Sequence, residues 1–232
     1  MKRNRKLAIV SNICLAAVVF AVACVCLYPV GVSTSGGSGR ILTGGDRGGA
    51  QISLLLSVYE GEEYIPPILD VLDEYGAKAT FFVGGSWADG HAGALREIAS
   101  RGHEVGNFGY FERDMSALPQ EKCEQELRLC GALVEALTGA RPSLFLPPCG
   151  AYGDGLLDAA EALGYTPVLW SKDAACADAA LVCERAAEGE AGDFVRLLPS
   201  AETLSALPSV LRGFEERGLS AVTLSACIGG HA

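Results

Sequence analysis

The sequence predicts an α/β fold in which parallel strands alternate with helices, arranged as a sheet or a barrel. Three observations support this prediction. Short apolar runs alternate with amphipathic segments over roughly 175 residues, glycines follow several of the amphipathic segments, and the 232 residues are 50% hydrophobic but only 20% charged. This composition fits one main domain with a single core and argues against a disordered or fibrous protein.

The predicted elements alternate along the chain from residue 51 onward. Residues 51–58 (QISLLLSV) have the pattern of a buried strand, and residues 66–75 (PPILDVLDEY) have the apolar spacing of a helix that ends at Gly76. Further strands are predicted at residues 77–83, 103–107, 144–147, 166–170, 193–198 and 221–224, and further helices at residues 92–100, 120–137, 155–163, 179–187 and 204–217. Ligands of parallel α/β folds bind at the carboxyl ends of the strands, so the residues that follow each strand are candidates for the functional site.

The charge balance limits the classes of partner. Asp and Glu number 28 against 18 for Lys and Arg, which gives a formal net charge of −10. Four of the basic residues lie within residues 1–6, so the rest of the chain is more acidic than the total indicates. An acidic chain without a basic stripe argues against nucleic acid as a partner.

Residues 7–28 form an apolar run without a single charge. As a helix this run would span ~33 Å, which is enough to cross a bilayer. The basic residues 1–6 would stay in the cytoplasm, which predicts a single-pass protein of the cell membrane with its C-terminal domain extracytoplasmic. Two alternatives stay open: a cleavable signal peptide with the small residues Ala21 and Ala23 at its end, and a lipoprotein signal that ends at Cys24.

Residues 29–50 are rich in Gly and Ser and predict a flexible linker. Beyond it, the domain contains six cysteines, which are Cys123, Cys130, Cys149, Cys176, Cys183 and Cys227. An even number in an oxidising compartment is compatible with disulfides, and buried free thiols are the alternative. Cys123 and Cys130 are predicted on one face of a helix, ~10 Å apart, which is too far for a disulfide between them.

Several segments are similar, in order, to motifs of the polysaccharide deacetylase family, also called the NodB homology domain. SVYEG at residues 57–61 resembles the family's thr-phe-asp-asp-gly motif, and YGAKATFFV at residues 75–83 and GHEVGN at residues 102–107 are close to its typical wording. FLPPCGAY at residues 145–152 resembles a later motif. The resemblance covers nearly all of residues 51–227 and implies a domain at residues 51–228 with the deformed (β/α) barrel that members of the family share.

The resemblance also implies where the family's chemistry would lie. In the family, one Asp and two His hold a divalent metal whose bound water attacks the amide of an N-acetylated sugar, with an Asp as base and a His as acid. The three metal positions fall on Glu60, Phe108 and Glu112. The positions of the base, of the Arg that orients it, of that Arg's Asp partner and of the acid fall on Tyr59, Leu146, Cys176 and Leu198, or on Pro199 for the acid if the alignment shifts by one.

Every catalytic position is therefore replaced, while the surrounding motifs are kept. Phenylalanine cannot ligate a metal, and the three histidines His91, His103 and His231 fall on none of the positions that the family uses. Glu60 and Glu112 could still bind Ca²⁺ or Mg²⁺ weakly or act as a glycosidase pair, but two hydrated acids are the simpler interpretation. No cofactor is expected, and zinc or another divalent metal is expected only if the protein is an active enzyme.

The aromatic residues Tyr59, Phe108, Tyr110, Phe111 and Tyr152 fall on loops that would border one groove and could stack on sugar rings. By contrast, Phe81 and Trp170 are predicted to be packing residues. The predicted glycan groove consists of Tyr59, Glu60, Phe108, Tyr110, Glu112, Pro148, Cys149 and Tyr152.

The sequence thus predicts a membrane-anchored, catalytically inactive homologue that binds cell-envelope glycan or a protein partner in an envelope or sporulation assembly. One alternative is an active metal-dependent hydrolase that removes N-acetyl groups from a polysaccharide or peptidoglycan. A third class, a purely structural interaction module, predicts no glycan binding at all.

Overall fold

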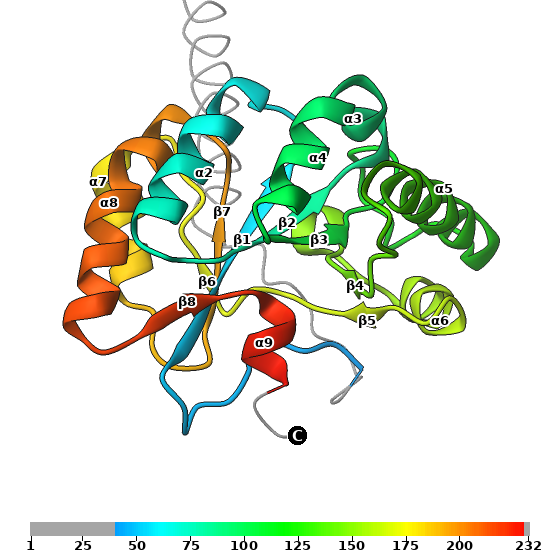
Figure 1. The fold of residues 1–232 in the computed structure, drawn as a ribbon. Coiled ribbons are helices and arrows are strands. Elements are labelled where there is room, and N and C mark those ends of the chain that lie inside the picture. The colour runs from blue at the N-terminus through cyan, green and yellow to red at the C-terminus, as the bar shows by residue number, and fades with distance from the viewer. Residues whose placement is uncertain (1–39, 230–232) are drawn as a thin grey trace, which may run out of the picture. The chain divides into compact units, whose positions relative to one another are not determined.

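Residues 40–229 are described by the computed structural model, and their core is an eight-stranded parallel sheet (Figure 1). The strand order is β5-β4-β3-β2-β1-β7-β6, and β8 pairs with the first part of β1. The strands are β1 (Gln51–Val58), β2 (Thr80–Val83), β3 (Glu104–Asn107), β4 (Leu144–Phe145), β5 (Thr166–Pro167), β6 (Lys172–Asp173), β7 (Phe194–Leu197) and β8 (Ser220–Val222).

Helices follow most of the strands, as the alternation predicts. They are η1 (Glu62–Tyr64), α2 (Ile65–Glu74), α3 (Gly85–Gly90), α4 (Ala92–Ser100), α5 (Gln120–Thr138), η2 (Pro148–Gly150), α6 (Asp154–Ala162), α7 (Ala179–Ala187), α8 (Ala201–Glu216) and α9 (Leu224–Ile228). In Figure 1, α2, α7 and α8 lie to one side of β1, and α5 and α6 lie to the other. The predicted anchor at residues 7–28 lies outside the described residues, and within residues 40–229 no helix has the length and apolarity needed to span a bilayer.

The predicted barrel is present as a parallel half-barrel. The hydrogen-bonded path ends at β5 and β6, which do not pair with each other although only residues 168–171 separate them. Part of the predicted linker lies along β5, where Leu42 donates from its amide to the Pro167 carbonyl at 2.9 Å and accepts from Leu169 at 2.8 Å. Arg40 forms ion pairs with Asp158 and Glu161 of α6. Residues 40–42 are therefore packed on the domain.

The two faces of the sheet carry different clusters of apolar side chains. Side chains alternate along β1, so Leu54 and Leu56 point to a large outer cluster beneath the helices, whereas Leu55 points to an inner cluster. Leu224 and Cys227 of α9 belong to the inner cluster. The amide of Leu224 donates to the Thr80 hydroxyl at the start of β2, so α9 covers the inner face at the amino ends of the strands.

The element predictions differ from the structure mainly in short segments. Residues 92–100 and 179–187 were predicted as helices with the bounds of α4 and α7, and β1 has its predicted bounds. The predicted strand at residues 166–170 is only two residues long in the structure, where it forms β5 beside β4. After β5 the chain moves away from β4 and then pairs with β7 as β6. The sequence analysis missed α3, β6 and α9, which are too short to show a periodic pattern.

All six cysteines between residues 40 and 229 are free thiols. Cys123 and Cys130 are buried on α5, as the helical spacing predicts. The Cys130 thiol donates to the Val83 carbonyl at 3.3 Å, and burial raises its pKa to about 12. The alternative of buried free thiols therefore holds in this structure for Cys123, Cys130 and Cys227, whereas Cys176 and Cys183 are half-buried and Cys149 is exposed.

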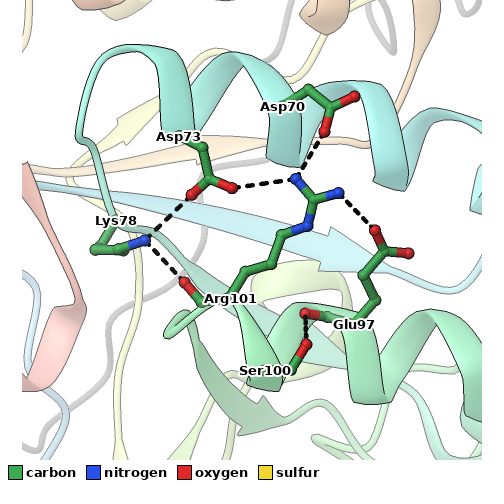
Figure 2. A network of polar contacts seen from close by, with 6 residues as sticks. All are labelled: Asp70, Asp73, Lys78, Glu97, Ser100 and Arg101. Carbon is green, nitrogen blue, oxygen red and sulfur yellow. Dashed lines mark hydrogen bonds and ion pairs between the residues drawn. The ribbon is translucent and has the colours of Figure 1, made fainter.

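A polar network connects α2 and α4 at the amino ends of the strands (Figure 2). The Arg101 guanidinium donates to Asp70 at 2.6 Å, to Asp73 at 3.1 Å and to Glu97 at 2.7 Å. Lys78 donates to Asp73 and to the Arg101 carbonyl. Because this face lies opposite the carboxyl ends of the strands, the network serves stability and not ligand binding.

His103 is buried beside this network, and its burial is expected to make the stability of the fold sensitive to acid. Its Nδ1 accepts the Ala79 amide at 3.2 Å, and its buried Nε2 has no partner among the described residues. Burial is the main cause that lowers the pKa of His103 to about 4; Lys78 and Arg101 contribute to this lowering, and Asp73 opposes it.

Since His103 binds its proton more weakly in the folded state, the unfolded state gains more protons as the pH falls from about 6.5 to about 4. The His103 contribution to stability is complete above pH 6.5, and about 3 kcal/mol is lost by pH 4. Urea unfolding of wild type and of His103→Gln, carried out at several pH values between 6.5 and 4, measures this loss of stability. The variant is expected to lose less stability on acidification than wild type, and equal losses would contradict the assignment.

Candidate functional site

Tyr59 follows β1 and occupies the carboxyl end of the half-barrel. Its ring packs on the Phe108 ring with centroids 4.8 Å apart. Its hydroxyl donates to the carbonyl oxygens of Phe108 and Phe111, at 2.5 and 3.0 Å. A Cβ at Gly84 would overlap the Tyr59 ring, so only glycine after β2 leaves room for this side chain. Tyr59 thus fills the space between the ends of β1, β2 and β3.

The Tyr59 hydroxyl is a fixed donor. Burial raises its pKa far above the ordinary tyrosine range, and the nearby thiols of Cys130 and Cys149 and the Glu112 carboxylate raise it further. The phenol therefore stays protonated at physiological pH and cannot act as a general base there.

The loop after β3 is held by a buried carboxylate on α5. Glu126, 5% exposed, accepts the amides of Tyr110 and Phe111 at 3.0 Å each and pairs with Arg113. The Gly85 and Ser86 amides donate to the Gly109 and Tyr110 carbonyls. Each backbone amide and carbonyl of residues 108–111 has a hydrogen-bond partner, so the conformation of this part of the loop is well determined.

The metal positions that the resemblance implies do not form a metal site. Glu60 and Glu112 are both exposed, and Phe108 is buried and offers no donor atom. Across residues 40–229 there is no group of three or more His, Cys, Asp or Glu side chains that could hold a metal ion. A zinc site needs at least three protein ligands, so the residues present do not fit the metal on which the family's chemistry depends.

The other positions implied by the resemblance are apolar or lie apart. Leu146 after β4 is fully buried in the inner cluster, and Leu198 after β7 is half-buried. Cys176 packs against the outer cluster and donates to the Asp178 carbonyl, so it does not share the inner face with Leu146. None of these three positions carries the Arg, Asp or His that the resemblance implies there.

The remaining groove residues lie on the turn after β4. Pro148 is buried, whereas Cys149 is exposed and adopts a left-handed conformation with φ of 60°. Tyr152 is half-buried and packs against a third cluster beneath α5 and α6. Burial is the main cause that raises the pKa of the Cys149 thiol, and the Asp114 and Glu112 carboxylates raise it further. Cys149 is therefore close enough to Glu112 for their charges to interact.

Three features of this end of the molecule are not predicted by the sequence. Gly84 and Glu126 carry no motif, and their roles depend on contacts with distant loops. The sequence does contain a signal for Arg196, because its charge interrupts the otherwise apolar strand β7. Its guanidinium lies over the Trp170 ring, 4.5 Å from the centroid, so Trp170 is more than the packing residue that was predicted.

Comparison with known proteins places the domain. Residues 49–168 match the family model described as polysaccharide deacetylase. A peptidoglycan-N-acetylglucosamine deacetylase of Bacillus cereus is 30% identical over 172 residues, which cover 70% of this chain and 80% of that protein. The uncharacterized protein YlxY of Bacillus subtilis is 32% identical over 122 residues, which cover 53% of this chain and 38% of that protein. The chain thus spans about two fifths of the length of YlxY.

Solved structures show the same fold. A CE4 family pseudoenzyme from Bacillus anthracis superimposes with a TM-score of 0.77 and 24% identity, covering 80% of this chain and 67% of that one. A mutant of that pseudoenzyme is described as having restored enzymatic activity. The family model matches more than half of the residues, and the half-barrel agrees with it. The chain therefore belongs to the polysaccharide deacetylase family.

Proposed function

We propose that the protein is a catalytically inactive polysaccharide deacetylase homologue that binds cell-envelope glycan, anchored to the membrane by residues 7–28. The observation that carries the proposal is the packing of Tyr59 on Phe108. These two side chains stand where the resemblance places the base and a metal ligand, and the Tyr59 hydroxyl is held by backbone carbonyls. Neither side chain supplies a base or a ligand to the family's reaction.

Glycan binding is supported by the aromatic residues of the loop after β3. Phe111 is 50% exposed, packs edge-on against Tyr110 and carries the Arg113 guanidinium over its ring. Glu126 fixes the backbone on which Phe111 stands. A rigid, exposed aromatic ring binds an apolar sugar face at little entropic cost.

The experiment uses the full-length protein in detergent and has two measurements. The first is zinc content after incubation with zinc, together with acetate release from N-acetylated peptidoglycan. Zinc well below one ion per chain and no acetate are expected. Stoichiometric zinc with acetate release would establish the alternative, an active metal-dependent deacetylase.

The second measurement is sedimentation with purified peptidoglycan. Phe111→Ala is expected to weaken binding about tenfold, which corresponds to about 1.4 kcal/mol for one stacking contact. Leu129→Ala is the matched control, because Leu129 is 49% exposed on α5 but lies outside the predicted groove. If wild type does not sediment with peptidoglycan, the glycan proposal fails and a purely structural interaction module remains.

A further inference from the structure

Arg196 points into the half-barrel from β7. It pairs in register with Leu55 of β1, so the two side chains emerge on the same face of the sheet. Leu55 and Phe194, two residues before Arg196, both belong to the inner cluster. A guanidinium on this apolar face is costly unless its donors are satisfied.

Three neighbours hold the Arg196 side chain. Its Nη1 donates to the Asp173 carboxylate at 3.1 and 3.3 Å, and its Nε donates to the Ser57 hydroxyl at 3.4 Å. The guanidinium lies over the Trp170 ring. The side chain is only 20% exposed, and its Nη2 donates to no residue between 40 and 229 in this structure. One end of a fixed guanidinium is thus available to a ligand.

Arg196 belongs to the same end of the molecule as the predicted groove. A Cβ at Gly150 would lie 2.6 Å from Cη2 of Trp170, so the turn after β4 packs directly on this ring. Burial raises the pKa of the Cys149 thiol most, and Asp114 and Glu112 raise it further. The Arg196 charge opposes them and lowers this pKa. The Cys149 turn is therefore close both to the acidic side chains Asp114 and Glu112 and to Arg196.

Building on the proposed glycan binding, we infer that Arg196, fixed by Trp170 and Asp173, binds the carboxylate of an anionic sugar residue. Arginine has five donors and can hold a second carboxylate beside Asp173. The acidic side chains Glu112 and Asp114 near the Cys149 turn repel an anion, so the charged sugar is directed to Arg196.

The test titrates full-length protein in detergent with two tetrasaccharides of equal length and follows binding by calorimetry. One is a neutral N-acetylglucosamine oligomer, and the other is a peptide-free peptidoglycan fragment in which alternate sugars carry a carboxyl group. A free peptidoglycan stem peptide forms a third arm, which separates sugar carboxylates from peptide carboxylates. Wild type is expected to bind the anionic tetrasaccharide about tenfold more tightly than the neutral one, with a preference that shrinks at high salt.

Arg196→Leu is expected to abolish the preference, and Arg196→Lys to reduce it, because lysine keeps the charge but loses the planar donors. The lysine variant decides the outcome if the leucine variant does not fold. Arg212→Leu is the control, since Arg212 is exposed on α8 and contacts only the Tyr75 hydroxyl, at 3.4 Å, among the described residues.

Equal affinity of wild type for both tetrasaccharides, an unchanged preference in the Arg196 variants, or tighter binding of the stem peptide would overturn the inference and leave glycan binding intact. If neither tetrasaccharide binds wild type, the proposed function itself is wrong.

Discussion

Four substitutions at the ends of β1 and β3 are expected to create a zinc site. Tyr59→Asp and Glu60→Asp supply the base and the first ligand that the resemblance implies, and Phe108→His and Glu112→His supply the other two ligands. The combination removes both stacked rings and so vacates the space that Tyr59 fills beside Gly84. Binding of about one zinc ion per chain is expected, because three protein ligands and one open position make a catalytic zinc site.

Elemental analysis after dialysis measures the zinc. The control carries Glu60→Asp and Glu112→His alone, so that both aromatic rings remain, and it is expected to bind far less metal. Addition of Leu198→His to the four substitutions supplies the implied acid, and acetate release from N-acetylated glycan is then expected. If the control binds zinc as well as the fourfold variant does, the aromatic pair does not fill the metal position.

Glu126→Ala is expected to destabilise the domain by about 3 kcal/mol, because charged acceptors contribute more than neutral ones and their loss leaves amides unpaired. The substitution removes the acceptor of the Tyr110 and Phe111 amides and the partner of Arg113. Peptidoglycan sedimentation should weaken too, since Phe111 stands on the released loop. Urea unfolding followed by circular dichroism measures the stability.

Glu124→Ala provides the control for this change. Glu124 lies on the same helix and pairs with Arg128 at the surface, at 3.2 Å, where an ion pair contributes less than about 0.5 kcal/mol. A loss of similar size in both variants would mean that removing either carboxylate from α5 destabilises the domain, and that the loop contacts of Glu126 are not the cause.

Apolar patterns within a single segment predict those helices and strands of this fold that form from their own sequence. The mainly apolar run of β1 and the amphipathic spacing of α4 and α7 were sufficient to set their bounds. The short α3 contains glycine at both ends and depends on the burial of Trp87 and Ala88, which no periodic pattern reveals. Predictions fail where tertiary contacts replace propensity.

The site shows the same division. The sequence indicates that Tyr59 and Phe108 replace reactive residues, but these residues lie 49 positions apart, and their stacking is a property of the folded chain. The contact of Arg196 with Ser57 joins residues 139 positions apart. Glu60 and Glu112, which the sequence places in one pocket, are exposed in the structure.

The contact between Tyr59, Phe108 and Gly84 also couples these positions, so that a change at one of them disturbs the packing of the others. A reversion at Tyr59 alone deprives two carbonyls of their donor and leaves a gap beside Gly84. A reversion at Phe108 alone removes the ring on which Tyr59 packs. Each single step lowers stability before a metal site is complete, so the substitutions at Tyr59 and Phe108 have to be made together.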